Sequence, residues 1–288
     1  MMGRVISVIL YLILAPLIGG LCDGIDRKIS ARMQRRVGPP LLQPFYDVHK
    51  LLHKQWIAVT DTQILLLMIW MFLMIFTGCM FYSGTDVLMC IFMLSTAGIF
   101  LYFTGCSTDS PFSMIGAQRE LIQEMACEPA LLMAGLGFYL VRGSFEGTRI
   151  IAGPVSPILY MPGFFAAYVF ILTIKMRKSP FDESTSHHAH QELVKGVTTE
   201  VGSVSLAMFQ ITEWYENVFL MGITALFVLN SHALSIPAAL AVIALVYFFE
   251  ILIDNTSARM KWGSMLLLSW GVTLVLAGVN LIILILVL

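Results

Sequence analysis

The sequence predicts an all-α, polytopic membrane protein of about eight transmembrane helices with two large cytoplasmic loops. Its composition is 58% hydrophobic and 12% charged, with a mean hydropathy of +0.84, whereas a soluble domain is usually about 25% charged. Apolar runs recur along the chain, each close to the roughly 20 residues that cross a bilayer. The basic residues fall mostly on alternate connections between these runs. We expect residues 1–288 to form a single transmembrane domain.

The expected spans follow from the apolar runs in chain order. They are residues 4–22, 64–82, 86–104, 120–141, 159–177, 200–229, 235–253 and 264–286. The first has the look of a signal peptide, but many spans follow it, so we interpret it as a retained helix. The sixth is long and polar in places, which predicts a tilted or broken helix.

Basic residues set the predicted orientation. Fourteen of the 17 lysines and arginines lie at the connections that follow odd-numbered spans. The positive-inside rule places these connections in the cytoplasm, with both termini outside the cytoplasmic (inner) membrane of the cell. The net charge of -1 gives no indication of a nucleic-acid partner.

The five cysteines predict no redox centre in this chain. They form no CxxC pair, and four of them lie in or at the ends of apolar runs, where cysteine behaves as a small hydrophobic residue. Iron–sulfur and nickel sites need several thiolates at close spacing. We therefore expect no bound cofactor and no metal here.

Carboxylates recur inside the fourth expected span. Glu120, Glu124 and Glu128 are four residues apart, so they share one helix face. Pro129 follows directly and removes a helical hydrogen bond, which can admit water. A carboxylate at the bilayer centre costs about 2.5–3.5 kcal/mol. Glu124 and Glu128 therefore predict a proton relay through the bundle interior, whereas we expect Glu120 at the membrane interface.

The sixth and seventh spans carry further acids. Glu213 and Glu216 are three residues apart in the sixth span, and Glu200 lies at its mouth. We include all three in the expected relay, because intramembrane charge usually faces a cavity or a partner. Glu250 and Asp254 end the seventh span, and they either serve the relay or are simply solvated near the cytoplasmic surface.

The first loop contains Gly38-Pro39-Pro40, which predicts a rigid turn, and a helix is expected after Pro44. The predicted apolar stripe of this helix is Leu42, Phe45, Leu52 and Trp56, with Asp47, Lys50 and Lys54 elsewhere. A short basic amphipathic helix beside a membrane lies in the interface or under a docked protein. His49 and His53 have the spacing of paired zinc ligands, but no third ligand lies nearby in the sequence.

The second loop reads PFDESTSHHAHQELVK and is dense in titratable groups. These are Asp182, His187, His188, His190 and Glu192, with Glu183 beside Asp182. A metal site is chemically plausible, although adjacent histidines point apart in any regular element. The loop can instead contact a partner, or collect and pass protons, because histidine titrates near pH 6.5. The last two interpretations are compatible.

Four motifs together resemble a known family: RRVGPPLLQPFYDVHKLLHK, GAQRELIQEMACEP, SPFDESTSHHAHQELVKG and EWYE. The chain resembles, over essentially its whole length, the membrane subunit that respiratory complex I shares with group 4 membrane-bound nickel–iron hydrogenases. The match is closer to the hydrogenase branch, which includes energy-converting hydrogenases and formate hydrogenlyase. The first loop has a short GPP where the quinone-reducing relatives carry a longer glycine–proline segment, and a histidine-rich insert replaces a denser acidic run. Both segments line the quinone cavity in those relatives, so the resemblance puts quinone binding in doubt.

The resemblance also implies roles for individual residues. Asp182 and Glu192 match loop acids near the redox arm, while Glu128 and Glu213 match the membrane glutamates of the fourth and sixth spans. The matches to the docking motif of the first loop are Arg36, Gln43, Asp47 and Lys50.

The function implied is that of an integral membrane subunit of an energy-converting nickel–iron hydrogenase complex. It would anchor the soluble redox arm and couple electron transfer to proton or sodium translocation. The nickel–iron site and iron–sulfur clusters are expected in partners: the soluble large and small hydrogenase subunits and an iron–sulfur subunit, with antiporter-like membrane subunits as separate chains. The alternatives are a quinone-site membrane subunit of a complex I-like NADH dehydrogenase, a passive anchor, and a histidine-gated metal transporter.

Overall fold

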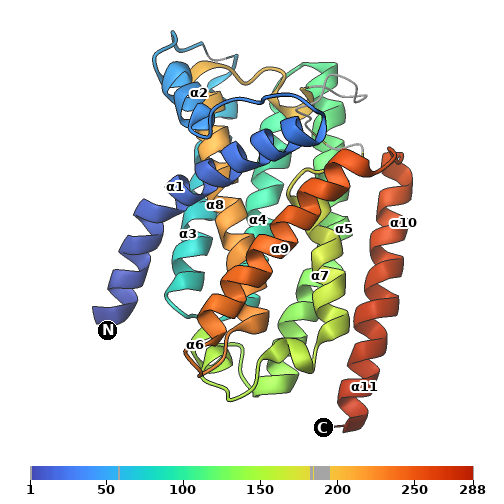
Figure 1. The fold of residues 1–288 in the computed structure, drawn as a ribbon. Coiled ribbons are helices and arrows are strands. Elements are labelled where there is room, and N and C mark those ends of the chain that lie inside the picture. The colour runs from blue at the N-terminus through green and yellow to red at the C-terminus, as the bar shows by residue number, and fades with distance from the viewer. Residues whose placement is uncertain (1, 58, 182–183, 185–194, 288) are drawn as a thin grey trace.

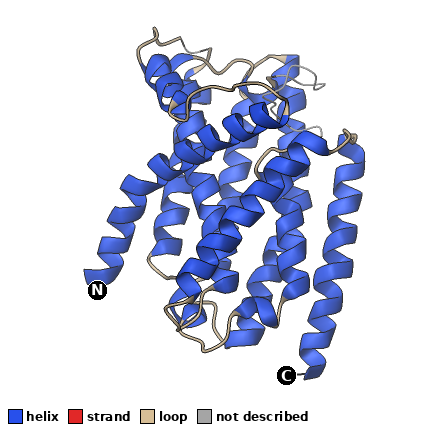
Figure 2. Cartoon of the chain, in the orientation of Figure 1, coloured by secondary structure: helices blue, strands red, loops and turns tan. Residues whose placement is uncertain are grey.

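The computed structural model describes residues 2–57, 59–181, 184 and 195–287. Within these ranges the chain is built of helices joined by loops, and no strand is present (Figure 2). In chain order the helices are α1 (Met2–Met33), α2 (Gln43–Leu52), α3 (Asp61–Tyr82), α4 (Val87–Cys106), α5 (Pro111–Arg142), α6 (Gly147–Ile151), η1 (Pro157–Leu159), α7 (Pro162–Lys175), η2 (Gly196–Thr198), α8 (Ser203–Val228), α9 (Ser235–Thr256), α10 (Trp262–Val272), the π-helical η3 (Thr273–Gly278) and α11 (Val279–Val287).

In the described part of the chain, six helical segments are long and apolar enough to cross a membrane: α1, α3, α4, α5, α9 and the continuous run α10–η3–α11. The other two expected spans are α7, which is apolar but has only 14 residues, and α8, which carries two glutamates. More than half of the residues of α7 and α8 are buried, whereas most of α9 is not. The prediction of an all-helical membrane protein is confirmed, with α7 and α8 in its interior.

The helices form a bundle whose two ends differ (Figure 1). α2 and its flanking loops lie at one end, and both marked termini lie toward the other. α1 and α9 run obliquely across the bundle in this view. The core between the helices is filled by large apolar side chains, among them Trp70, Phe138, Phe164 and Phe219.

Two helices extend well beyond the apolar runs that predicted them. α1 continues to Met33 rather than ending near residue 22, and α5 begins at Pro111 rather than at residue 120. One face of the first turns of α5 is covered by protein: a Cβ on Gly116 would collide with the backbone of η2. Polar residues are therefore tolerated in the helix. Glu120, which we expected at the membrane interface, is buried between helices and only 5% exposed.

One expectation about helix shape is corrected in part. The sixth span is not broken, because α8 runs from Ser203 to Val228 as one helix. α5 continues through Pro129 to Arg142, in agreement with the span expected over 120–141. The predicted apolar stripe of α2 is only partly right. Phe45 of that stripe packs against Trp214 of α8, with 5.3 Å between the ring centroids, and buried Val48 belongs to the same cluster. Leu42, Leu52 and Trp56 of the predicted stripe are exposed.

Candidate functional site

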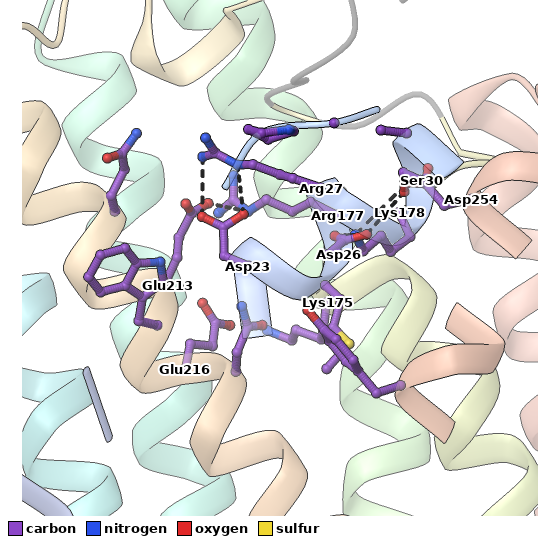
Figure 3. Close-up of a pocket in the computed structure, with 18 of the residues that line it drawn as sticks. Asp23, Asp26, Arg27, Ser30, Lys175, Arg177, Lys178, Glu213, Glu216 and Asp254 are labelled. Carbon is purple, nitrogen blue, oxygen red and sulfur yellow. Dashed lines mark hydrogen bonds and ion pairs between the residues drawn. The ribbon is translucent and has the colours of Figure 1, made fainter. Parts of the chain in front are cut away.

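A cavity of about 600 Å³ opens at the end of the bundle that carries α2. Its walls come from α1 and the turn after it, the end of α7, α8 and α9, as Figure 3 shows. Half of its lining residues are charged: Asp23, Asp26, Arg27, Arg36, Lys175, Arg177, Lys178, Glu213, Glu216 and Asp254. Ionised groups at this density need mutual pairing, because isolated buried charges are costly.

On the α1 wall, Arg27 joins the cavity to the first loop. Its guanidinium lies 3.0 Å from the carboxylate of Asp23 one turn earlier and 2.8 Å from that of Asp47 in α2. Gln43 donates a hydrogen bond of 2.9 Å to the same Asp47. Asp47 of the predicted docking motif thus holds α2 against α1, and Gln43 of the same motif orients Asp47 from within α2. Both are internal contacts as well as candidate docking groups.

On the opposite wall, Arg177 joins α5 and α8. It lies 3.3 Å from Glu213 and 3.4 Å from Glu120, and its guanidinium sits 5.3 Å from the ring centre of Phe209. Its backbone has a φ of 53°, a left-handed conformation that non-glycine residues adopt uncommonly. Such local strain persists when surrounding contacts hold it in place, and here the two carboxylates and the ring do so.

Below Arg177 lies a buried ion pair. The ammonium of Lys175 is 2.6 Å from Glu124, and both side chains are less than 10% exposed. Gly98 of α4 makes room for this carboxylate, because a Cβ at that position would overlap it. A void of about 10 Å³ beside the pair, close to the size that holds one water, is lined by Glu120, Gln123, Glu124, Ile174, Lys175, Arg177 and Glu216. Glu216 lines both cavities and so connects the large one to the buried pair.

The second loop reaches this group of acids at Ser184. Its hydroxyl donates a short hydrogen bond to Glu120 and accepts one of 3.3 Å from Arg177. Ser184 is fully buried. We call Glu120, Glu124, Glu213, Glu216, Lys175 and Arg177 the buried acid network. A displacement of Ser184 would therefore break or strain its hydrogen bond to Glu120.

A separate cluster lies on the α9 side of the cavity (Figure 3). Lys178 forms an ion pair with Asp26 of α1 and lies 3.8 Å from Asp254 of α9. Asp254 also accepts a hydrogen bond of 3.0 Å from the backbone N–H of Ser179. Burial lowers the pKa of Lys178, but Asp26 and Asp254 outweigh it, so that the pKa lies above its usual value. This lysine therefore stays charged while it links three segments.

The structure brings together part of the predicted relay. Glu124, Glu213 and Glu216 belong to the buried acid network. Glu128 is half-buried and lines neither cavity, and Glu200 lies half-exposed in the turn after η2. The predicted relay residues that lie outside the described residues are Asp182, His187, His188, His190 and Glu192.

The docking residues separate into two kinds. Arg36 is exposed at the mouth of the cavity and Lys50 is exposed on α2, whereas Gln43 and Asp47 are engaged within the chain. Among the described residues, no group of three histidine, cysteine, aspartate or glutamate side chains could hold a metal ion.

Sequence reasoning missed several residues of the site. Asp23, Asp26 and Arg27 had a usable signal, since they are three and four residues apart at the end of the first apolar run. Lys175 and Lys178 are among the 14 basic residues that set the predicted orientation, and their spacing gives no indication of their acidic partners. Of the two alternatives for Glu250, the solvated one is wrong, because Glu250 is 0% exposed.

Comparisons with known proteins agree with this architecture. The family model described as NADH dehydrogenase matches residues 6–285. Hydrogenase-4 component C of Escherichia coli is 32% identical over 216 residues, which cover 69% of this chain and 66% of that relative. An NADH-quinone oxidoreductase subunit of Dehalococcoides mccartyi is 25% identical over 90% of this chain and 79% of its own length. A chain of the membrane-bound sulfane sulfur reductase, an archaeal respiratory membrane complex, has the same fold, with a TM-score of 0.83, 21% identity and coverage of 98% of this chain and 99% of that one.

Proposed function

Because the chain belongs to the NADH dehydrogenase family, we propose that it is the ion-coupling membrane subunit of an energy-converting nickel–iron hydrogenase complex. The coarser assignment, a membrane subunit of a complex I-like oxidoreductase complex, follows from its relatives. In the finer proposal the chain anchors a soluble redox arm and couples electron transfer to proton or sodium translocation. The nickel–iron and iron–sulfur centres belong to the soluble partners, and antiporter-like subunits are separate membrane chains.

The observation that carries the proposal is the buried acid network at the floor of a charged cavity. Four carboxylates from α5 and α8 lie around two cations, Lys175 and Arg177. Buried ionised groups are retained at a cost in stability, and within membranes they commonly mark ion or proton pathways. A carboxylate in excess of its cations can take up or release a proton when the surrounding charge changes. Such a group is suited to moving ions in step with a reaction in a partner.

The two loops supply a connection from that partner to the acids. The first loop exposes the apolar residues Val37, Trp56 and Ile57 beside basic Arg36 and Lys50. Exposed apolar surface rimmed by charge is typical of a protein–protein contact. The second loop contacts Glu120 through Ser184. A soluble arm docked over both loops would therefore touch elements bound to the acid network, and we place this side in the cytoplasm and both termini outside.

The chemistry of the cavity favours ion handling over quinone reduction. Sites for small organic ligands are lined predominantly by apolar and aromatic side chains, whereas half of the residues around this cavity are charged. The relative with the highest identity quoted above is a hydrogenase component. The second candidate is a quinone-site subunit, and the observation in its favour is the similarity to an NADH-quinone oxidoreductase subunit over most of the chain. Detection of bound quinone, or of quinone-dependent turnover, in the purified complex would favour the quinone-site subunit.

The test is the number of ions moved per electron in the Glu213→Gln variant of the intact complex in vesicles. The variant keeps the shape of the side chain but removes its titration, so we expect the ratio to fall roughly tenfold or more, as for loss of a positioned proton-transfer group. Glu146→Gln is the matched control, because Glu146 lies between α5 and α6 at the other end of the bundle and pairs with exposed Arg149. Both variants are normalised to hydrogen-dependent dye reduction. An unchanged ratio in Glu213→Gln would refute the proposal.

A further inference from the structure

A carboxylate outside the buried acid network lacks a hydrogen-bond partner for either oxygen within the described part of the chain. Glu250 lies in α9 and is 0% exposed, and both of its carboxylate oxygens are buried without such a partner there. Buried polar atoms are nearly always hydrogen-bonded, so each exception calls for an explanation. The explanation must differ from that for Glu124, which has the ammonium of Lys175 at 2.6 Å.

Among the described residues, the surroundings of Glu250 contain one cationic group and one second acid. Asp254 lies four residues later on the same face of α9, a spacing that brings side chains within about 5–6 Å at Cβ. The charged groups that act on Glu250 are Lys178, after α7, and Asp254. From α7 the titratable neighbour is Tyr168, whose hydroxyl donates to the backbone of α8 at 2.7 Å. From α1, Asp26 reaches this group through its ion pair with Lys178.

An ionised Glu250 is poorly accommodated in the arrangement described. Lys178 is turned toward Asp26 and Asp254 and forms no hydrogen bond with Glu250. A buried carboxylate without donors loses its hydration and gains nothing in return. The protonated acid carries no charge and avoids most of that cost. In this arrangement Glu250 is therefore best described as a protonated acid that lies one helical turn from Asp254, which lines the cavity.

We propose that Glu250 is a proton-binding residue that exchanges its proton with the cavity through Asp254 and Lys178. In this step the O–H bond of Glu250 breaks and the proton passes to the carboxylate of Asp254, directly or through one water. The ammonium of Lys178 then turns from Asp254, now neutral, to the new carboxylate of Glu250. One proton moves and no electron is transferred, so the charge of the cluster is conserved. The role in ion coupling rests on the proposed function, but the proton exchange itself does not.

This branch is distinct from the buried acid network. Glu250 and Asp254 lie on α9, and neither lines the small void beside the Lys175–Glu124 pair. Lys178 contacts α1 and α9, whereas Arg177, its neighbour in the sequence, contacts α5 and α8. Two adjacent cations at the start of the second loop thus serve two separate sets of acids. A change in this segment would act on both sets at once.

The test is an acid-minus-alkaline infrared difference spectrum of the purified intact complex. We expect the wild-type spectrum to contain a carboxylic C=O signal, shifted in D₂O, that is lost in Glu250→Gln and retained in the control Glu146→Gln. Should Glu250→Gln fail to assemble, Glu250→Asp keeps the carboxyl group and is expected to shift the frequency of the signal. A spectrum of Glu250→Gln, or of Glu250→Asp, that is identical to wild type would overturn the proposal.

The spectrum separates this inference from the proposed function, because it records protonation without any requirement for ion transport. Loss of the signal in Glu250→Gln supports proton exchange even if Glu213→Gln translocates ions normally, a result that would refute only the proposed function. If the carboxylic C=O signal persists unchanged in Glu250→Gln, proton exchange at Glu250 is refuted, even if Glu213→Gln fails to translocate ions.

Discussion

Glu124 in α5 and Glu250 in α9 are both buried carboxylates in membrane helices, yet they have opposite surroundings. Glu124 lies 2.6 Å from Lys175, in space left free by Gly98. Glu250 has no hydrogen bond to either oxygen from the residues that the structure describes. Glu124 thus has a cation in direct contact, Lys175. The cation nearest in role for Glu250 is Lys178, which pairs with Asp26 and Asp254 instead.

The difference shows that the residue type and its burial do not decide the state of a membrane acid. The decisive factor is the charge contributed by a neighbouring segment. Lys175 and Lys178 are three residues apart, at the end of α7 and just after it, but they serve acids on different sides of the bundle. A pair with an ideal partner holds its charge, whereas an acid without one is suited to holding a proton. The following variants test that contrast.

Removal of the cation from the first site has the largest expected effect. Lys175→Met leaves Glu124 as a buried, uncompensated carboxylate, and breaking a buried pair in this way costs about 3–5 kcal/mol. We expect reduced assembly and a lower unfolding temperature of the purified complex. Adding Glu124→Gln to the same chain should recover most of the loss, since no unpaired charge remains. Failure of the double variant to recover would mean that Lys175 matters for some reason other than this pair.

Displacing the same carboxylate without removing charge has an intermediate effect. In Gly98→Ala the new methyl group overlaps Glu124, so the carboxylate must shift from Lys175 or the helices must separate. Overpacking of this kind costs about 1–3 kcal/mol. The measurement is the unfolding free energy of the complex. Gly135→Ala is a suitable control, because its Cβ would meet only flexible side-chain ends beyond 3.0 Å. Equal losses in the two variants would contradict a special role for Gly98.

Neutralising the second site has the smallest effect on stability. Glu250→Gln removes no ion pair and no hydrogen bond that the structure describes. We therefore expect the unfolding free energy to change by less than about 1 kcal/mol. A loss as large as that of Lys175→Met would show that Glu250 has a strong partner, and the contrast between the two acids would then fail.

The helices of the bundle could be predicted from the sequence, because the length of an apolar run is a local property of the chain. Each expected span has a helical counterpart, and departures such as the start of α5 at Pro111 occur where other protein covers one face of the helix. The acids Glu124, Glu213 and Glu216 were also found from the sequence, since charge within an apolar run is conspicuous.

The partners of those acids could not be found in the same way. Lys175 is 51 residues from Glu124, and Lys178 is 152 residues from Asp26. Such pairings depend on how helices pack, and no local pattern encodes them. The sequence leaves the solvation of Glu250 open for the same reason, because its position near the end of a span does not reveal which helices cover it. Glu128 shares the spacing of Glu120 and Glu124 but drifts around the helix to a half-buried position.

The most direct test of the account is ion translocation per electron in the Glu216→Gln variant of the complex in vesicles. Glu216 is the acid that lines both the large cavity and the void beside the Lys175–Glu124 pair. We predict that the ratio falls strongly while Glu146→Gln keeps the wild-type value. A Glu216→Gln complex that assembles and moves as many ions per electron as the wild type would contradict the claim that these acids carry the coupled ion.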